Sequence, residues 1–169
     1  EKDRSVRRNT GETENTEDAP ITEEGPEFGQ FLSVVREICT SMAKKIAGDG
    51  EGATKLVECT VTGAPSLPLA KAVAKSVITS SLTKAAMFGA DANWGRILCA
   101  IGYTEGDFNV DTIRVDISSA KGSILVCENS AGVAFDEGKA KEILLQEEIH
   151  IEIGMGQGDA QATAWGCDL

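Results

Sequence analysis

The spacing of hydrophobic residues changes several times along this chain, and these changes limit the folds it can adopt. Between residues 28 and 46, large apolar side chains recur every three or four positions, which places them on one face of a helix. Across residues 55–62, 113–117 and 149–153, apolar and polar residues alternate, as on a strand with one buried face. Such strands favour an antiparallel or mixed sheet, because strands of a purely parallel sheet are buried on both faces.

The remaining segments predict more helices and strands. We expect helices near residues 68–78, 81–88, 97–102 and 136–146, and further strands near 124–127 and 161–167. Pro68 suits the first turn of a helix, and Asp136 is a suitable N-terminal cap. The predicted fold class is therefore α/β or α+β, with mixed, largely antiparallel sheet layers flanked by helices, over residues 27–169.

Residues 1–26 have a different composition. They consist largely of acids, Thr, Asn and Gly, and their only sizeable aliphatic residues are Val6 and Ile21. Such a segment buries too little apolar surface to offset the entropy lost on ordering. We predict a flexible acidic arm or a long insertion loop here, and a functional charged tail is the alternative.

Charge and hydropathy exclude several kinds of partner. The net charge of −11 argues against nucleic acid, whose ligands carry basic patches. No apolar run approaches the roughly 18 residues of a membrane span, and no signal-peptide pattern is present. We expect no membrane association. Bacterial cytoplasm is the expected compartment, and the mitochondrial matrix is the alternative for a eukaryotic protein.

The five cysteines predict neither a zinc site nor a disulfide framework. They are widely spaced and form no C-x-x-C pair: Cys39, Cys59, Cys99, Cys127 and Cys167. We interpret them as buried, reduced thiols in a reducing compartment. We expect no metal and no cofactor.

Two weak motifs carry little functional information. The glycines at 154, 156 and 158 lack the G-x-G-x-x-G pattern that opens a helix in dinucleotide sites, so we predict a hairpin turn there. His150 is the only histidine and alternates with Ile149 and Ile151, which places it on the outer face of the sheet. The sequence shows no nucleophile to pair with it, so we expect a surface histidine.

Two polar segments are better candidates for a site. GDGEGATK, at residues 48–55, is either an ordinary surface turn or a loop whose glycines let a ligand approach a carboxylate. A carboxylate held there can pair with a substrate ammonium group. In DANWGR, at residues 91–96, Asn93, Trp94 and Arg96 either contact a ligand or are structural, with Arg96 clamping Asp91 and Trp94 in the core.

Four motifs in order resemble one family. GDGEGATK (48–55), SSLTKAA (80–86), FGADANWGRI (88–97) and ATAWGCDL (162–169) closely resemble the β chain of the bifunctional glutamate N-acetyltransferase/ornithine acetyltransferase family of arginine biosynthesis, over residues 28–169. The resemblance implies the self-cleaving ornithine acetyltransferase or DmpA-like fold. It also implies transfer of an acetyl group from N-acetylornithine to glutamate through an acetyl-threonine, with acetyl-CoA as a further donor in some members.

The resemblance also implies partners and one site residue. The precursor of such proteins cuts itself before the nucleophilic threonine, and its α and β chains assemble as a heterotetramer of two α and two β chains. The substrate-contacting glutamate of the family matches Glu51, whereas no role carries over to residues 93–96. The cleavage site with its threonine and the C-terminal substrate contacts have no match, so no catalytic residue is assigned and we expect an internal fragment that is inactive alone.

Two other functions stay open from the sequence. One is a non-catalytic amino-acid-binding or interaction domain that keeps the scaffold without the nucleophile. The other is a related self-cleaving aminopeptidase, against which the NWGR and WGCDL stretches speak.

Overall fold

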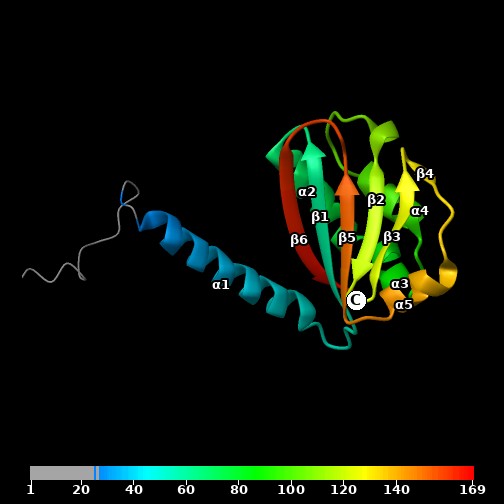
Figure 1. Ribbon diagram of the computed structural model, residues 1–169, viewed down its shortest axis with the longest axis horizontal. Coiled ribbons are helices and arrows are strands. Elements are labelled where there is room, and N and C mark those ends of the chain that lie inside the picture. The colour runs from blue at the N-terminus through cyan, green and yellow to red at the C-terminus, as the bar shows by residue number, and fades with distance from the viewer. Residues whose placement is uncertain (1–24, 26) are drawn as a thin grey trace, which may run out of the picture. The chain divides into compact units, whose positions relative to one another are not determined.

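The computed structural model contains one mixed β-sheet, and helices cover one of its two faces (Figure 1). It describes residue 25 and residues 27–169, so the arm predicted for residues 1–26 lies outside the described part except for Gly25. The chain divides into two compact units, residues 1–38 and residues 39–169.

Helices and strands follow the predicted order. They are α1 (Phe28–Gly48), β1 (Leu56–Ala64), α2 (Leu67–Thr79), α3 (Ser81–Phe88), α4 (Trp94–Gly102), the 3-10 turn η2 (Val110–Thr112), β2 (Arg114–Ser119), β3 (Gly122–Glu128), β4 (Ala131–Gly132), α5 (Glu137–Leu144), β5 (Glu148–Gly154) and β6 (Ala160–Cys167). The Asp136 side chain caps α5 as expected, by accepting from the Lys139 N–H. The short strand β4 has no counterpart among the predictions.

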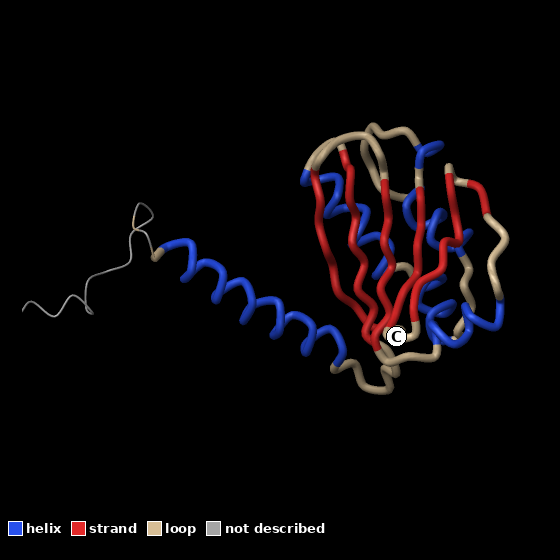
Figure 2. The backbone as a smooth tube through the Cα atoms, viewed as in Figure 1, coloured by secondary structure: helices blue, strands red, loops and turns tan. Residues whose placement is uncertain are grey.

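The described strands form a six-stranded sheet in the order β4-β3-β2-β5-β1-β6 (Figure 2). Strands β1 and β5 run parallel, with Cys59 opposite Ile151, and every other neighbouring pair is antiparallel. Helices α2 to α5 lie on one face of this sheet (Figure 1). The predicted fold class, a mixed and largely antiparallel sheet with flanking helices, is confirmed.

Alternation along the central strands separates the core from a polar face. The side chains that face the helices are fully or almost fully buried: Val57, Cys59, Val61, Val115, Ile117, Ile149, Ile151 and Ile153. Each buried aliphatic side chain contributes about 1.5–3 kcal/mol to folding, and helix α2 adds Val73 and Val77 to the same core. The intervening residues of β1 and β5, such as Glu58 and His150, therefore lie on the opposite face.

Helix α1 is amphipathic as predicted, but none of its described side chains is buried. Met42 and Ile46, in its second half, are both more than half exposed. In the part of the chain that the structure describes, no helix is long and apolar enough to cross a membrane.

The predicted hairpin turn at glycines 154–158 is wrong. Strand β1 lies between β5 and β6, so this segment crosses the end of β1 instead of joining two neighbouring strands. The crossing is held by Gln157 N–H, which donates to the Gly63 carbonyl at 2.8 Å. It also requires close backbone approach, because a β-carbon on Gly158 would lie 2.5 Å from the Ala64 carbonyl oxygen.

The prediction that all five cysteines are buried is wrong in part. Cys59 and Cys127 are buried, Cys167 is partly exposed, and Cys39 and Cys99 are exposed. Cys99 lies in α4 but apart from the buried stripe formed by Ile97, Ala100 and Ile101. Apolar surroundings in the sequence did not distinguish the inner face of a helix from its outer face.

Candidate functional site

Glu51 lies in a tight turn between α1 and β1. The Ala53 N–H donates to the Gly50 carbonyl at 2.8 Å, which closes a four-residue turn with Glu51 and Gly52 at its centre. Gly52 has φ of +87°, as the third position of a type II turn requires. Glycine is favoured there because an L side chain is strained in that conformation.

The glycines of this turn also allow close contact with the C-terminal residues. A β-carbon on Gly50 would lie 3.1 Å from the Cys167 sulfur, and one on Gly52 would lie 3.2 Å from a methyl carbon of Leu169. The sequence predicted that these glycines let a ligand approach, whereas the groups that the structure places against Gly50 and Gly52 are the protein's own Cys167 and Leu169.

Asp168 fixes the residues that follow the turn. Its carboxylate accepts hydrogen bonds from the Thr54 N–H at 2.8 Å, the Thr54 hydroxyl at 2.5 Å and the Lys55 N–H at 3.1 Å. Its side chain is almost fully buried, with 3% of the residue exposed. Burial by itself raises the pKa of this carboxyl, but the hydrogen bonds from Thr54 and Lys55 outweigh it and hold the pKa below the ordinary value.

Lys55 ties the same residues to helix α3. Its ammonium group donates to the carbonyls of Met87 at 2.5 Å and Phe88 at 3.1 Å, at the C-terminal end of α3, where a cation is favoured. Lys55 is 8% exposed, and this burial lowers its pKa, partly offset by the nearby charge of Asp168. Lys84 of α3 in turn donates to the Leu169 carbonyl.

All four motifs that suggested the family thus meet in one place. The hydrogen bonds of Asp168, Lys55 and Lys84 join residues 48–55, 80–86, 88–97 and 162–169. Glu51 itself is exposed, and within the described residues its carboxylate has no hydrogen-bond or ion-pair partner. A carboxylate that is free on a rigid turn can accept hydrogen bonds from an ammonium ligand.

The DANWGR segment has a structural role. The Asn93 side chain caps α4 by accepting from the Arg96 N–H at 3.2 Å and donates to Asp91 at 3.0 Å. Arg96 donates to the Leu82 carbonyl of α3 at 3.2 Å and not to Asp91, the partner that the structural alternative named. Trp94 is partly buried against the core, as the structural interpretation expected.

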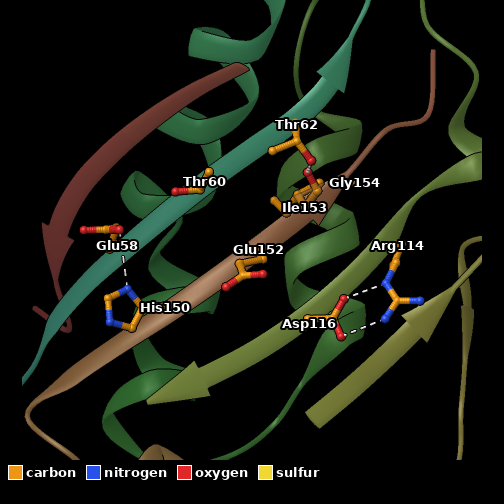
Figure 3. A pocket seen from close by; sticks show the side chains of 9 residues that line it. All are labelled: Glu58, Thr60, Thr62, Arg114, Asp116, His150, Glu152, Ile153 and Gly154. Carbon is orange, nitrogen blue, oxygen red and sulfur yellow. Dashed lines mark hydrogen bonds and ion pairs between the residues drawn. The ribbon is translucent and has the colours of Figure 1, made fainter. Parts of the chain in front are cut away.

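The polar face of the sheet carries a second candidate, a shallow cavity of about 260 Å³ (Figure 3). His150 lies there, as expected for the outer face, and its Nδ1 is 3.4 Å from Glu58. Glu58 also accepts from Trp165 Nε1 and Lys44 Nζ, each at 2.7 Å. Burial raises the pKa of Glu58, but these hydrogen bonds and the charges of Lys44 and His150 bring it below its ordinary value.

The charges of this cavity are largely satisfied within the protein. Arg114 donates to both oxygens of Asp116, at 2.7 and 3.0 Å, and to Glu128 at 2.8 Å. The Glu51 turn does not line the cavity. Among the residues with described positions, no group of three or more His, Cys, Asp or Glu side chains could hold a metal ion.

The sequence interpretation missed the anchoring residues of the turn. Asp168 and Lys55 were quoted within motifs but given no role. No local signal distinguished them, because a charged residue beside a strand is usually exposed and its burial cannot be predicted from its neighbours in sequence.

Comparison with known proteins confirms the resemblance to this family. The ArgJ family model matches residues 8–169. The arginine biosynthesis bifunctional protein ArgJ of Caldanaerobacter subterraneus subsp. tengcongensis is 47% identical over 153 residues, which cover 90% of this chain and 38% of that protein. A glutamate N-acetyltransferase of Methanopyrus kandleri is 44% identical over 140 residues, covering 83% of this chain and 36% of that protein.

A solved structure also matches this chain. The crystal structure of the arginine biosynthesis bifunctional protein argJ from Bacillus halodurans has 41% sequence identity and a TM-score of 0.82, covering 88% of this chain and 68% of that one. The chain therefore shares its fold with that protein and spans little more than a third of the length of the curated relatives described above.

Proposed function

Because this chain belongs to the ArgJ family, we propose that the protein containing it is an acetyltransferase of arginine biosynthesis. It moves the acetyl group of N-acetylornithine to glutamate, and this chain supplies part of the substrate site. The observation that carries the proposal is the turn of residues 50–53, which presents a Glu51 carboxylate without a partner among the described residues, on a backbone anchored by Asp168.

The proposed reaction is nucleophilic acyl transfer in two steps. A threonine outside this chain attacks the acetyl carbonyl, and the amine of ornithine leaves with a proton, which gives an acetyl ester on the threonine. The amine of glutamate then attacks this ester, and the threonine oxygen recovers a proton. The terminal amine of the threonine chain is the base, and an oxyanion site in the α chain stabilises the tetrahedral intermediates.

Glu51 recognises the donor substrate in this proposal. The α-amine of N-acetylornithine carries the acetyl group, so the only free ammonium of this molecule is at the end of its side chain. A carboxylate binds such a group through a charge-assisted hydrogen bond. This contact orients the donor without taking part in the bond changes, so its loss raises KM more than it lowers kcat.

Assembly and compartment belong to the same proposal. The partner of this chain is the α chain of the same precursor, in a heterotetramer of two α and two β chains. The protein works in the cytoplasm, or in the mitochondrial matrix of a eukaryote. Acetyl-CoA is a further donor to be tested in the same assay.

The test follows labelled acetyl from N-acetylornithine to glutamate in the full-length protein. Glu51→Gln keeps the size of the side chain and removes its charge. We expect kcat/KM for N-acetylornithine to fall at least about tenfold, which corresponds to ~1.4 kcal/mol of transition-state binding. Glu105→Gln is the matched control, because Glu105 is also an exposed loop carboxylate but lies after α4, apart from the turn; it should retain full activity.

Two outcomes would contradict the proposal. If the folded and processed wild-type protein transfers no label, the assignment of activity fails, and peptide hydrolysis or simple amino-acid binding becomes the better explanation. If the wild type is active and Glu51→Gln matches it, the activity stands and the role of Glu51 fails.

A further inference from the structure

Asp168 is placed to control the position of Glu51 without contacting substrate. With 3% of its surface exposed, its carboxylate cannot reach a ligand. Its hydrogen bonds go to Thr54 and Lys55, which follow Glu51 after only two residues. Any effect of Asp168 on a bound substrate therefore passes through the backbone of the turn.

The hydrogen bonds to Asp168 restrain both the position and the orientation of the backbone at Thr54 and Lys55. One carboxylate oxygen accepts two successive N–H groups, those of Thr54 and Lys55, and the other accepts the Thr54 hydroxyl. Two successive donors that share one acceptor allow little rotation of the peptide between them. Thr54 is itself exposed, so water could satisfy its hydroxyl if Asp168 were absent.

The turn is held from a second side by Lys55 and the glycines. The Lys55 ammonium reaches the end of α3, while Gly50 and Gly52 lie against Cys167 and Leu169. Cys167 and Leu169 thus contact one side of the turn. The Asp168 carboxylate between them holds Thr54 and Lys55, the residues that follow the turn. Sites that bind with precision are commonly held in this way by residues behind those that touch the ligand.

We propose that Asp168 is a positioning residue, which holds the turn of residues 50–53 so that Glu51 meets the ammonium group of the donor substrate. This inference rests on the proposed function. The hydrogen-bond geometry carries the effect, because an amide in place of the carboxylate still offers one oxygen to both N–H groups and an NH₂ group to the Thr54 oxygen.

The test is a double-mutant cycle on kcat/KM in the full-length protein, with Glu51→Gln as the second change. We expect Asp168→Ala to lower kcat/KM for N-acetylornithine about tenfold, mainly through KM, since small displacements of a binding group have effects of this size or larger. In the Glu51→Gln background the same change should have less than about a twofold effect. Asp168→Asn should stay within about threefold of wild type.

Asp136→Ala is the matched control for a merely structural effect. Asp136 also accepts a backbone N–H, from Lys139 at 2.9 Å, but it caps α5 and is not part of the turn. It should leave kcat/KM unchanged. If Asp168→Ala does not fold, Thr54→Val takes its place in the cycle, because it removes the hydroxyl bond, keeps the backbone bonds and changes an exposed residue.

The outcomes separate this inference from the proposed function. Additive effects of the Asp168 (or Thr54) and Glu51 substitutions, in an active protein that needs Glu51, overturn the positioning role alone. The same holds if Asp136→Ala lowers kcat/KM as much as Asp168→Ala does. A wild type without acetyl transfer, or an active wild type indifferent to Glu51→Gln, overturns the proposed function or the role of Glu51, and the inference falls with it.

Discussion

The Asp168 carboxylate accepts a hydrogen bond from the Thr54 hydroxyl at 2.5 Å, although the two residues are 114 positions apart. This contact lies where the pairing of β1 with β6 ends, one residue beyond the pair Leu56–Cys167. The backbone still pairs there once, since the Asp168 N–H donates to the Lys55 carbonyl at 3.3 Å. Beyond that point the side chain of Asp168 replaces the ladder and satisfies the next two N–H groups.

Asp168 should make stability depend on pH in the acid range. Its native-state pKa lies below the ordinary 3.8, so the charged form is favoured by folding. The resulting stabilisation is present above about pH 4, the unfolded-state pKa, and is lost as the pH falls through the lower native-state pKa. We expect wild type to exceed Asp168→Asn by about 1–2 kcal/mol in free energy of unfolding at pH 7.

Urea unfolding of both full-length proteins at several pH values from 7 to 2 measures this difference. It should shrink steadily below about pH 4, because the amide does not titrate. A difference that is the same at pH 7 and pH 2 would mean that the charge of Asp168 contributes nothing to folding.

Trp165 should stabilise the edge of the sheet through Glu58. Its indole N–H donates to the Glu58 carboxylate at 2.7 Å, across the pair of β1 and β6. Trp165→Phe keeps an aromatic ring and removes the donor. We expect the free energy of unfolding to fall by about 1 kcal/mol, less than for a fully buried hydrogen bond to a carboxylate, because Glu58 and Trp165 are partly exposed. Chemical denaturation measures it, and in a Glu58→Ala background, which removes the acceptor, the same substitution should cost less. Equal costs in both backgrounds would exclude the hydrogen bond as the cause.

Two glycine substitutions should change stability in opposite directions. A β-carbon on Gly158 would meet the backbone of Ala64 at 2.5 Å, where the chain crosses the end of β1, whereas one on Gly102 in α4 would meet nothing within 4 Å. Gly158→Ala should therefore cost about 1–3 kcal/mol, and Gly102→Ala should gain up to about 1 kcal/mol from helix propensity. Thermal unfolding of both variants measures these changes. A Gly158→Ala variant as stable as wild type would contradict the close contact between residue 158 and the Ala64 backbone.

Local patterns were sufficient to predict most elements of this fold, although η2 and the two-residue strand β4 were not predicted. Alternation across residues 55–62 predicted a strand with one buried face, because successive side chains of a strand point to opposite faces, and the structure shows Val57, Cys59 and Val61 on that face. The cap of α5 at Asp136 followed from helix-end chemistry. These features depend on neighbours in sequence.

Strand order and the anchors of the site could not be predicted in the same way. The alternation of β5 does not reveal that β1 will separate it from β6, so the segment at glycines 154–158 resembled a hairpin. Likewise, nothing near Asp168 in the sequence indicates Thr54 as its partner. Glu51 was a candidate through the resemblance to a family, and its turn through the glycines, but the hydrogen bonds that hold this turn come from residues far along the chain.

Cys59 should be unreactive in the folded protein. It is completely buried between core residues, and burial together with the charge of Glu58 raises the pKa of its thiol to about 12. At pH 8 only about one thiol in 10⁴ is then ionised, and a reagent must also wait for the sheet to open. A thiol reagent added to the native full-length protein should therefore modify Cys59 only at the rate of unfolding, which peptide mass spectrometry measures. Rapid modification under native conditions would show local opening around β1. This strand is paired on both sides, with β5 and with β6, so Cys59 becomes accessible only when the sheet or its helical cover opens.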